Sequence, residues 1–246
     1  AWLSAAAVAA FPDAVVAQAG TVAAALAALQ PAPDLALVDL GLPDGVQVVA
    51  GVPDLHAAAL GAGAVGEGEA HMALSSTSWI SLPLPRKKTD VLRGMATIPG
   101  FRGGYMLANN HDTSGLALQW LLDNVVAPGD ALAGTTGPGT CTYDDLTALA
   151  ATSPPGANRV IFTPWLAGER TPVSDSHLRG GFHNVSLTTT RADLVRAVLE
   201  GVAYNDHWLH GYVERFAKRR LDPVRVVGGG AQSELWCQIH ADVMDR

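Results

Sequence analysis

Three consecutive glycines, Gly228, Gly229 and Gly230, stand between a short apolar segment, residues 224–227, and a segment with helical character that begins at Glu234. This order predicts a strand, a tight turn and a helix. Because glycine has no side chain, a ligand can approach the backbone there, and the helix N-terminus offers unpaired N–H groups and a positive dipole end to an anion. The pattern favours a phosphate-binding turn between a strand and a helix.

A second interpretation of the glycine turn needs no ligand. Ser233 directly precedes the helix, where its side chain could cap the free N–H groups, and the glycines would then only permit a tight turn. The turn does not match the GxGxxG dinucleotide pattern, and no Walker A lysine accompanies it. Both interpretations stay open at this point.

Strand-like and helix-like segments alternate along the chain, which is typical of an α/β protein. With 246 residues and 48% hydrophobic content, the chain can bury a sizeable core. The expected elements are a strand at 46–50, a helix opening near Asp54, a hairpin centred on 75–78, a helix at 114–124, a strand at 160–163, a helix at 191–218, a strand at 224–227 and a final helix from Glu234.

The longest predicted helix is expected to serve packing and not catalysis. Thr190 and Asp193 have the spacing of a capping box at its start. One apolar stripe follows the helical period, made of Leu194, Val198, Val202, Leu209, Val213 and Phe216.

Asp54 is a candidate general base. It follows Gly51-Val52-Pro53, where a strand is expected to turn into a helix. A carboxylate at the mouth of a cleft could accept the proton of a hydroxyl that attacks the γ-phosphate of ATP. The alternative is that Asp54 caps the helix, since a side-chain oxygen there satisfies free backbone N–H groups.

Small hydroxyl residues, Ser75, Ser76, Thr77 and Ser78, separate two apolar strand-like segments. They could form a plain hairpin turn, because turns need small polar residues. They could also form a second phosphate-binding turn, in which backbone N–H groups and hydroxyls surround phosphate oxygens without a lysine.

Charge and cysteine content exclude several classes of function. The net charge is −7, and phosphate-polymer binders usually carry a basic surplus, so neither nucleic acid nor an anionic membrane is an expected partner. Two cysteines, Cys141 and Cys237, fit a reducing compartment, and we expect a cytoplasmic protein. His207 and His210 lie beside Asp206, but no fourth ligand accompanies them, so we expect no protein metal site.

Residues 1–44 differ from the remainder of the chain. Residues 33–45 resemble the third strand of response-regulator receiver domains, in which the position of Asp39 is the phosphoacceptor. The acidic pair and the lysine that such a domain needs are absent. We therefore expect a junction segment followed by a second unit at 45–246, with an ordinary helix and strand of one domain as the alternative.

Several segments of the second unit resemble the FGGY carbohydrate kinase family. Their counterparts in the family are the catalytic-aspartate segment, the first phosphate motif, the Gly-Glu-Arg-Pro loop, the C-terminal signature and the adenosine motif. In this chain they are residues 51–65, 74–80, 164–172, 180–200 and 228–242. Ser75 and Ser76 stand where the family usually has Gly-Thr.

The resemblance implies an actin- and hexokinase-like (ribonuclease H-like) ATPase fold, present as an incomplete C-terminal domain. It implies ATP and Mg²⁺ as cofactors and a ketopentose such as D-xylulose as substrate, and it is compatible with a homodimer. Asp54 inherits the role of the base, and the two turns inherit nucleotide contact through Ser75, Ser76, Thr77, Gly228, Gly229, Gly230 and Ser233. The competing hypotheses are a phosphoacceptor module at Asp39 and an inactive chimeric fragment.

Overall fold

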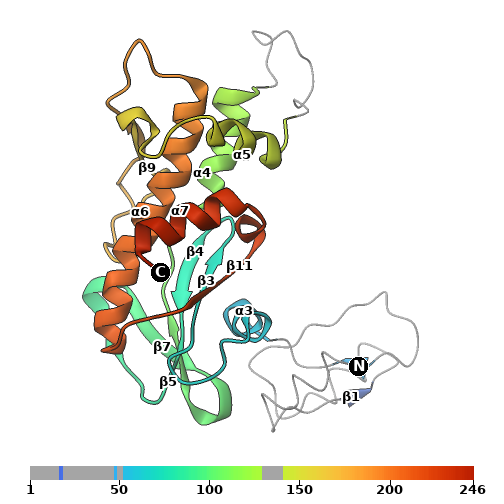
Figure 1. Ribbon diagram of the computed structural model, residues 1–246. Helices are drawn as coiled ribbons and strands as arrows, with labels where there is room; N and C mark the ends of the chain where they lie inside the picture. Colours follow the sequence, from blue (N-terminus) through green and yellow to red (C-terminus); the bar gives the residue numbers. More distant parts are fainter. Residues whose placement is uncertain (1–16, 19–46, 49–51, 129–140) are drawn as a thin grey trace.

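The computed structural model describes residues 17–18, 47–48, 52–128 and 141–246 (Figure 1). Its largest element is helix α6, Arg191–Ala217, which packs against elements from most of the described chain. The predicted helix at 191–218 is therefore confirmed. Thr190 accepts a hydrogen bond from the Asp193 N–H, and Asp193 accepts one from the Thr190 N–H, so the predicted capping box is present.

Asp193 also anchors the start of α6 to the segment before it. Burial by itself would raise the pKa of this carboxyl, but hydrogen bonds from Ser153, Thr190 and Asn158 outweigh burial and lower the pKa to about 2. The carboxylate thus stays ionised while nearly fully buried.

A three-stranded sheet carries both predicted turns at its strand ends. Its order is β11-β3-β4, with β11 parallel to β3 and β4 antiparallel to β3. The strands are β3, Ala70–Leu74, β4, Ser78–Ser81, and β11, Val224–Val227. Leu74 pairs with Ser78, so residues 75–77 form the hairpin turn, and the predicted hairpin and the predicted strand at 224–227 are confirmed.

A second sheet is antiparallel throughout, in the order β5-β8-β7-β6. It consists of β5, Pro83–Leu84, β6, Thr89–Asp90, β7, Met95–Pro99, and β8, Tyr105–Ala108. A two-stranded pair, β9, Ile161–Thr163, and β10, Gly181–His183, packs on α6. The alternation of strands and helices was thus predicted, but most strand pairs in the described residues are antiparallel.

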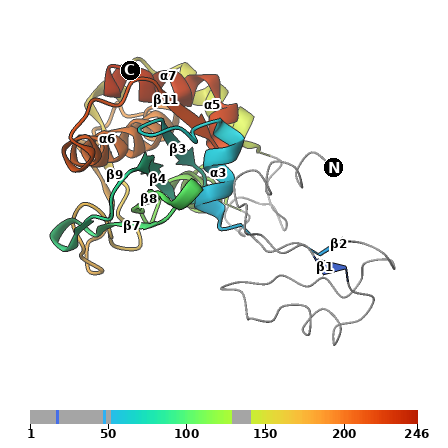
Figure 2. The ribbon, with the colours of Figure 1, turned by 90° about the horizontal axis from the view of Figure 1, so that it is seen from below.

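The shorter helices surround the first sheet and α6. In Figure 2, α3 lies on the other side of β3 from α6, and α7 runs along the same side as α6. The helices are α3, Asp54–Ala62, α4, Gly115–Leu121, continued by a π-helical turn at Leu122–Val126, α5, Tyr143–Ala151, and α7, Glu234–Met244. The predicted helices near Asp54, at 114–124 and from Glu234 are confirmed.

Helix α6 contributes to two of the three apolar clusters in the described residues. Its first half, including Val195 and Val202, packs with α4, α5, β9 and Trp236. Its second half, including Leu209 and Phe216, packs on both sheets. Buried polar residues, Asn205 and Asp206, lie between the two halves. The predicted apolar stripe is present, although Leu194 is only partly buried.

Most of residues 1–44 lie outside the described residues, including Asp39 of the receiver-like stretch. Within the described part, β1, Ala17–Gln18, pairs antiparallel with β2, Gln47–Val48, which falls in the strand predicted at 46–50. None of the helices in the described ranges is both long and apolar enough to cross a bilayer.

His71 lies in β3 with no exposed surface, and neither ring nitrogen has a hydrogen-bond partner among the described residues. Burial lowers its pKa from 6.5 to about 4. The unfolded chain therefore binds more protons than the folded chain between these two values. Stability is complete above pH 6.5 and falls as the pH drops toward 4.

We expect His71→Leu to remove this loss. In urea titrations at pH 8 and pH 5, the wild-type free energy of unfolding should fall by about 2 kcal/mol more than that of the variant. His183→Leu, at an exposed position, is the control. Equal pH dependence in wild type and His71→Leu would show that His71 does not become protonated on unfolding.

Candidate nucleotide and acceptor site

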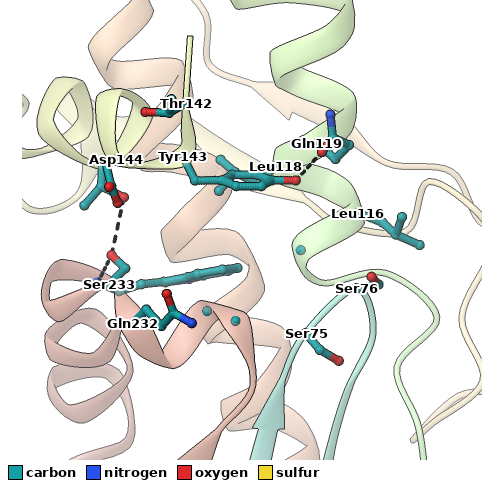
Figure 3. Close-up of a pocket in the computed structure, with 15 residues that line it drawn as sticks. Ser75, Ser76, Leu116, Leu118, Gln119, Thr142, Tyr143, Asp144, Gln232 and Ser233 are labelled. Atoms are coloured by element: carbon teal, nitrogen blue, oxygen red, sulfur yellow. Dashed lines mark hydrogen bonds between the residues drawn. The ribbon is translucent and has the colours of Figure 1, made fainter. Parts of the chain in front are cut away.

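The two predicted phosphate turns meet at one cavity of about 600 Å³. Figure 3 shows Ser75 and Ser76 on one side, Gln232 and Ser233 beside them, and Tyr143 with Gln119 across the opening. The cavity lies within the size range of sites for small molecules. Of the predicted nucleotide contacts, those that line it are Ser75, Ser76, Gly229, Gly230 and Ser233.

Backbone hydrogen bonds fix the hairpin turn to the start of α4. The carbonyl of Ser75 accepts from the Gly115 N–H at 2.7 Å, and the carbonyl of Ser76 accepts from Ser114 and Leu116 at 3.0 and 3.1 Å. The turn therefore satisfies the free N–H groups of α4. The N–H groups of Ser76 and Thr77 donate to no group in the described part of the chain.

Ser75 stands at the position where the family usually has glycine. Its hydroxyl donates to the Thr77 carbonyl at 3.0 Å, within the turn itself. This bond draws the added side chain toward the turn and reduces the crowding expected from a residue larger than glycine.

The glycines of the second turn differ in the space around the position that a Cβ would occupy. Gly228 has a φ of 100°, and a Cβ there would lie 2.5 Å from the Leu74 carbonyl oxygen. A Cβ on Gly230 would lie 2.5 Å from Cγ of Leu74. Gly228 thus packs against β3 and does not line the cavity, whereas Gly229 has no atom within 4 Å of its Cβ position.

Helix α7 begins at the cavity, as the sequence predicted. Ser233 is its N-cap and accepts from the Trp236 N–H at 3.2 Å. Capping was the alternative function of Ser233, and the residue both caps and lines the cavity. The Trp236 indole N–H donates to the Leu199 carbonyl at 3.0 Å, which fixes the ring beside the cavity.

Helices α4 and α5 form the opposite wall, which sequence reasoning missed. The Tyr143 hydroxyl donates to the Gln119 amide oxygen across the opening (Figure 3). Burial and the charge of Asp123 raise the pKa of Tyr143. A signal for this wall was present in the sequence. Thr142 and Asp145 have the spacing of a capping box, which starts α5 directly before Tyr143.

Among the described residues that line this cavity, Asp144 is the only charged one. A bound phosphate chain would therefore meet backbone N–H groups, hydroxyls and the N-terminal end of α7, and no lysine or arginine. A helix N-terminus carries about half a positive charge, which suits such an anion.

A smaller cavity of about 340 Å³ is also lined by the hairpin turn, through Thr77. Its polar lining contains one charged pair, because Arg170 lies 2.7 Å from Asp112. The lining residues are Asp54, Leu55, Thr77, Trp79, Asn109, Asn110, Asp112 and Arg170. The structure thus brings Asp54 and Thr77 together, while Ser75 and Ser76 line the larger cavity.

Asp54 is exposed and is the first residue of α3, which follows Pro53 as the N-cap. Its carboxylate accepts from the Leu55 N–H at 2.7 Å. Pro53 and not Asp54 holds the N-cap position, but the Asp54 carboxylate satisfies a free N–H group of the first turn, as the capping alternative expects. Asp54 still lies in the first turn, where a negative charge is favourable.

No group of three or more His, Cys, Asp or Glu side chains in the described ranges could hold a metal ion. The rings of His207 and His210 stack at 6.4 Å, but Asp206 points away from them and bonds to Ser78 and His240. Although Asp206 is adjacent to His207 in the sequence, its carboxyl group hydrogen-bonds to neither His207 nor His210.

Residues 65–246 match the model of the C-terminal domain of the FGGY family of carbohydrate kinases. The chain belongs to this family. A xylulose kinase of Staphylococcus epidermidis is 41% identical over 105 residues, which make up 42% of this chain and 21% of that protein. A gluconokinase of Bacillus subtilis is 25% identical over 213 residues, or 87% of this chain and 41% of that protein.

A solved structure, Plasmodium falciparum glycerol kinase with ADP, matches with a TM-score of 0.68 at 19% identity, over 81% of this FGGY chain and 38% of that chain. This likeness confirms the predicted actin- and hexokinase-like fold class. The chain spans between 21% and 41% of the length of these three relatives. None of the three supports the receiver-like interpretation of residues 1–44, and Asp54 precedes the residues that the family model matches.

The different surroundings of Gly228 and Gly229 give a direct test of the turn. We expect Gly228→Ala to lower the free energy of unfolding by about 3 kcal/mol, because it combines a left-handed φ with a clash against backbone. Gly229→Ala, with open space around its Cβ, is the matched control and should stay within ~0.5 kcal/mol of wild type. Urea unfolding of both variants measures this, and equal losses would contradict the described turn.

Proposed function

We propose that this chain carries the nucleotide-binding half and the general base of an ATP-dependent sugar kinase. One observation carries the proposal. The hairpin turn separates two cavities, with Ser75 and Ser76 lining the larger and Thr77 lining the smaller together with Asp54. A phosphate donor on one side and an acceptor on the other would meet at this turn.

The larger cavity suits ATP. Gly229 leaves open space for the approach of a ligand, and α7 begins beside it. The N–H groups of Ser76 and Thr77, which donate to no group in the described residues, are suitable donors to phosphate oxygens, because an oxyanion gains most from donors that are already fixed. Apolar surface for the adenine ring of ATP comes from Leu116, Leu118 and Trp236.

The smaller cavity suits a hydroxyl-rich acceptor. It presents carboxylates, amides and the Arg170 guanidinium, all of which pair with hydroxyl groups. The indole nitrogen of Trp79, which also lines it, is buried without a hydrogen-bond partner in the described residues.

The proposed reaction is one phosphoryl transfer. A sugar hydroxyl oxygen forms a bond to the γ-phosphorus of ATP while the bond from that phosphorus to the bridging oxygen of ADP breaks. The hydroxyl proton passes to the carboxylate of Asp54, and ADP leaves with the bonding electron pair. A positioned base of this kind contributes about 10² to 10⁴ in rate.

We propose a ketopentose such as D-xylulose as the sugar. The xylulose kinase relative supports this choice, although the gluconokinase relative acts, by its name, on a different sugar. Mg²⁺ is proposed to enter with the nucleotide, because this ion binds through one or two carboxylates and substrate phosphates. The carboxylates that line the smaller cavity are those of Asp54 and Asp112. A cytoplasmic location and a homodimer stay predictions.

The role of Asp54 is tested by Asp54→Asn in a protein of the relatives' length that carries this chain. We expect kcat to fall by about 10² to 10⁴ while the Kd for MgATP, measured by calorimetry, stays unchanged. Asp90→Asn is a matched control, since Asp90 also accepts a backbone N–H at the start of a helical turn and lines neither cavity. Retained turnover in Asp54→Asn would exclude the base role.

The nucleotide half is tested on the 246-residue chain itself. We expect MgATP binding, weakened about tenfold or more by Gly229→Ala, because the added methyl group would enter the space left for the ligand. Calorimetric titration of both folded proteins measures the effect. A folded wild-type chain that binds no MgATP would favour the inactive-fragment hypothesis, and labelling by a small phosphodonor would favour a phosphoacceptor at Asp39.

A further inference from the structure

A buried polar cluster lies at the middle of α6, and the proposed chemistry does not use it. Asn205 and Asp206 are 6% and 0% exposed and separate the two apolar halves of the helix. Side chains from four other places in the chain reach them. The buried polar cluster consists of Ser78, His111, Glu169, Asn205, Asp206 and His240.

One half of the cluster is centred on Glu169. His111 Nδ1 lies 2.9 Å from Oε2 of Glu169, and His111 Nε2 lies 3.2 Å from the Asn205 carbonyl oxygen. Both of these partners are acceptors, and the Asn205 amide nitrogen lies 3.0 Å from the same Nδ1. Burial by itself would lower the pKa of His111, but the hydrogen bond to Glu169 and the charges of Asp206 and Glu169 outweigh it and raise the pKa.

The other half is centred on Asp206. The Ser78 hydroxyl donates to Oδ1 at 2.6 Å, and His240 Nε2 lies 3.0 Å from Oδ2. His240 Nδ1 lies 2.8 Å from the Trp236 carbonyl oxygen, which can only accept, so Nδ1 carries a proton. The contact with Oδ2 needs a second proton, on either atom. Asp206 and His240 together therefore carry no net charge.

The two ends of this half lead to the walls of the larger cavity. Ser78 directly follows Thr77 and closes the hairpin turn. Trp236 lines the cavity, and its backbone N–H donates to the hydroxyl of Ser233, the N-cap of α7. A single buried carboxylate thus joins the hairpin turn to the first turn of α7.

We propose that Asp206 is a positioning residue, which fixes the distance between the hairpin turn and the start of α7 so that both bind the same phosphate chain. The effect on ATP binding rests on the proposed function, whereas the positioning of the two turns by Asp206 does not depend on it. Buried ion pairs are often no more stabilising than apolar residues of the same volume, so stability alone gives little reason for a carboxylate at this depth. Fixed geometry for binding groups is a separate reason.

The sharpest test is a pair of variants on β4. Ser78→Ala removes the bond to Asp206, while Ser81→Ala removes an equally buried hydroxyl that donates to the Leu107 carbonyl at 2.7 Å. Asp206→Asn, with Asp193→Asn as its control on the same helix, replaces the carboxyl group itself. Hydrogen exchange is measured on the full chain for the Ser75 and Gly115 N–H groups, which bond to the hairpin turn, and for the Trp236 N–H. The Kd for MgATP is measured on the same proteins.

We expect Ser78→Ala to speed hydrogen exchange in the hairpin turn about tenfold and to weaken MgATP binding by a similar factor, as expected for loss of a hydrogen bond to a charged group. Ser81→Ala should change neither by more than about twofold. Unchanged exchange in the turn of folded Ser78→Ala would overturn the proposal, even if Asp206→Asn does not fold. A wild-type chain that fails to bind MgATP would count against the proposed function, while the exchange data would still decide the positioning.

Discussion

The arrangement of the described chain depends on one buried carboxylate, Asp206. A carboxylate with no exposed surface must find hydrogen-bond donors inside the protein, because an unpaired buried charge costs several kcal/mol. Its donors come from β4 and α7, which are distant from it in the chain. Satisfying Asp206 therefore requires β4 of the first sheet and helix α7 to meet at the centre of α6. This point lies between the two apolar clusters to which α6 contributes.

Close packing of backbone at the sheet edge completes this arrangement. Gly228 lies against the Leu74 carbonyl, so the glycine turn packs on the end of β3 that leads into the hairpin turn. The same contact bears on the anion site proposed for the cavity, which has few charged groups. Its donors are backbone N–H groups held by packing, and fixed dipoles need no rearrangement when a ligand arrives.

Local signals in the sequence predicted most elements and both turns. Capping boxes, hairpin residues and glycine runs act over a few residues, and the α6 capping box at Thr190 was found as expected. Pairings across the chain were not predictable in the same way. Ser78 and Asp206 are 128 residues apart, and periodicity indicates which helix face is buried but not which side chain will meet it. The wall formed by Tyr143 and Gln119 was missed for the same reason.

The position of the hairpin turn between two cavities has a consequence for how this segment can vary. The Ser75 hydroxyl donates to the Thr77 carbonyl, so the side chain at this position is accommodated within the turn. An inserted residue could not be absorbed in this way, because Leu74 and Ser78 are paired on either side of the turn. Variation in this part of the chain is therefore restricted more in length than in composition.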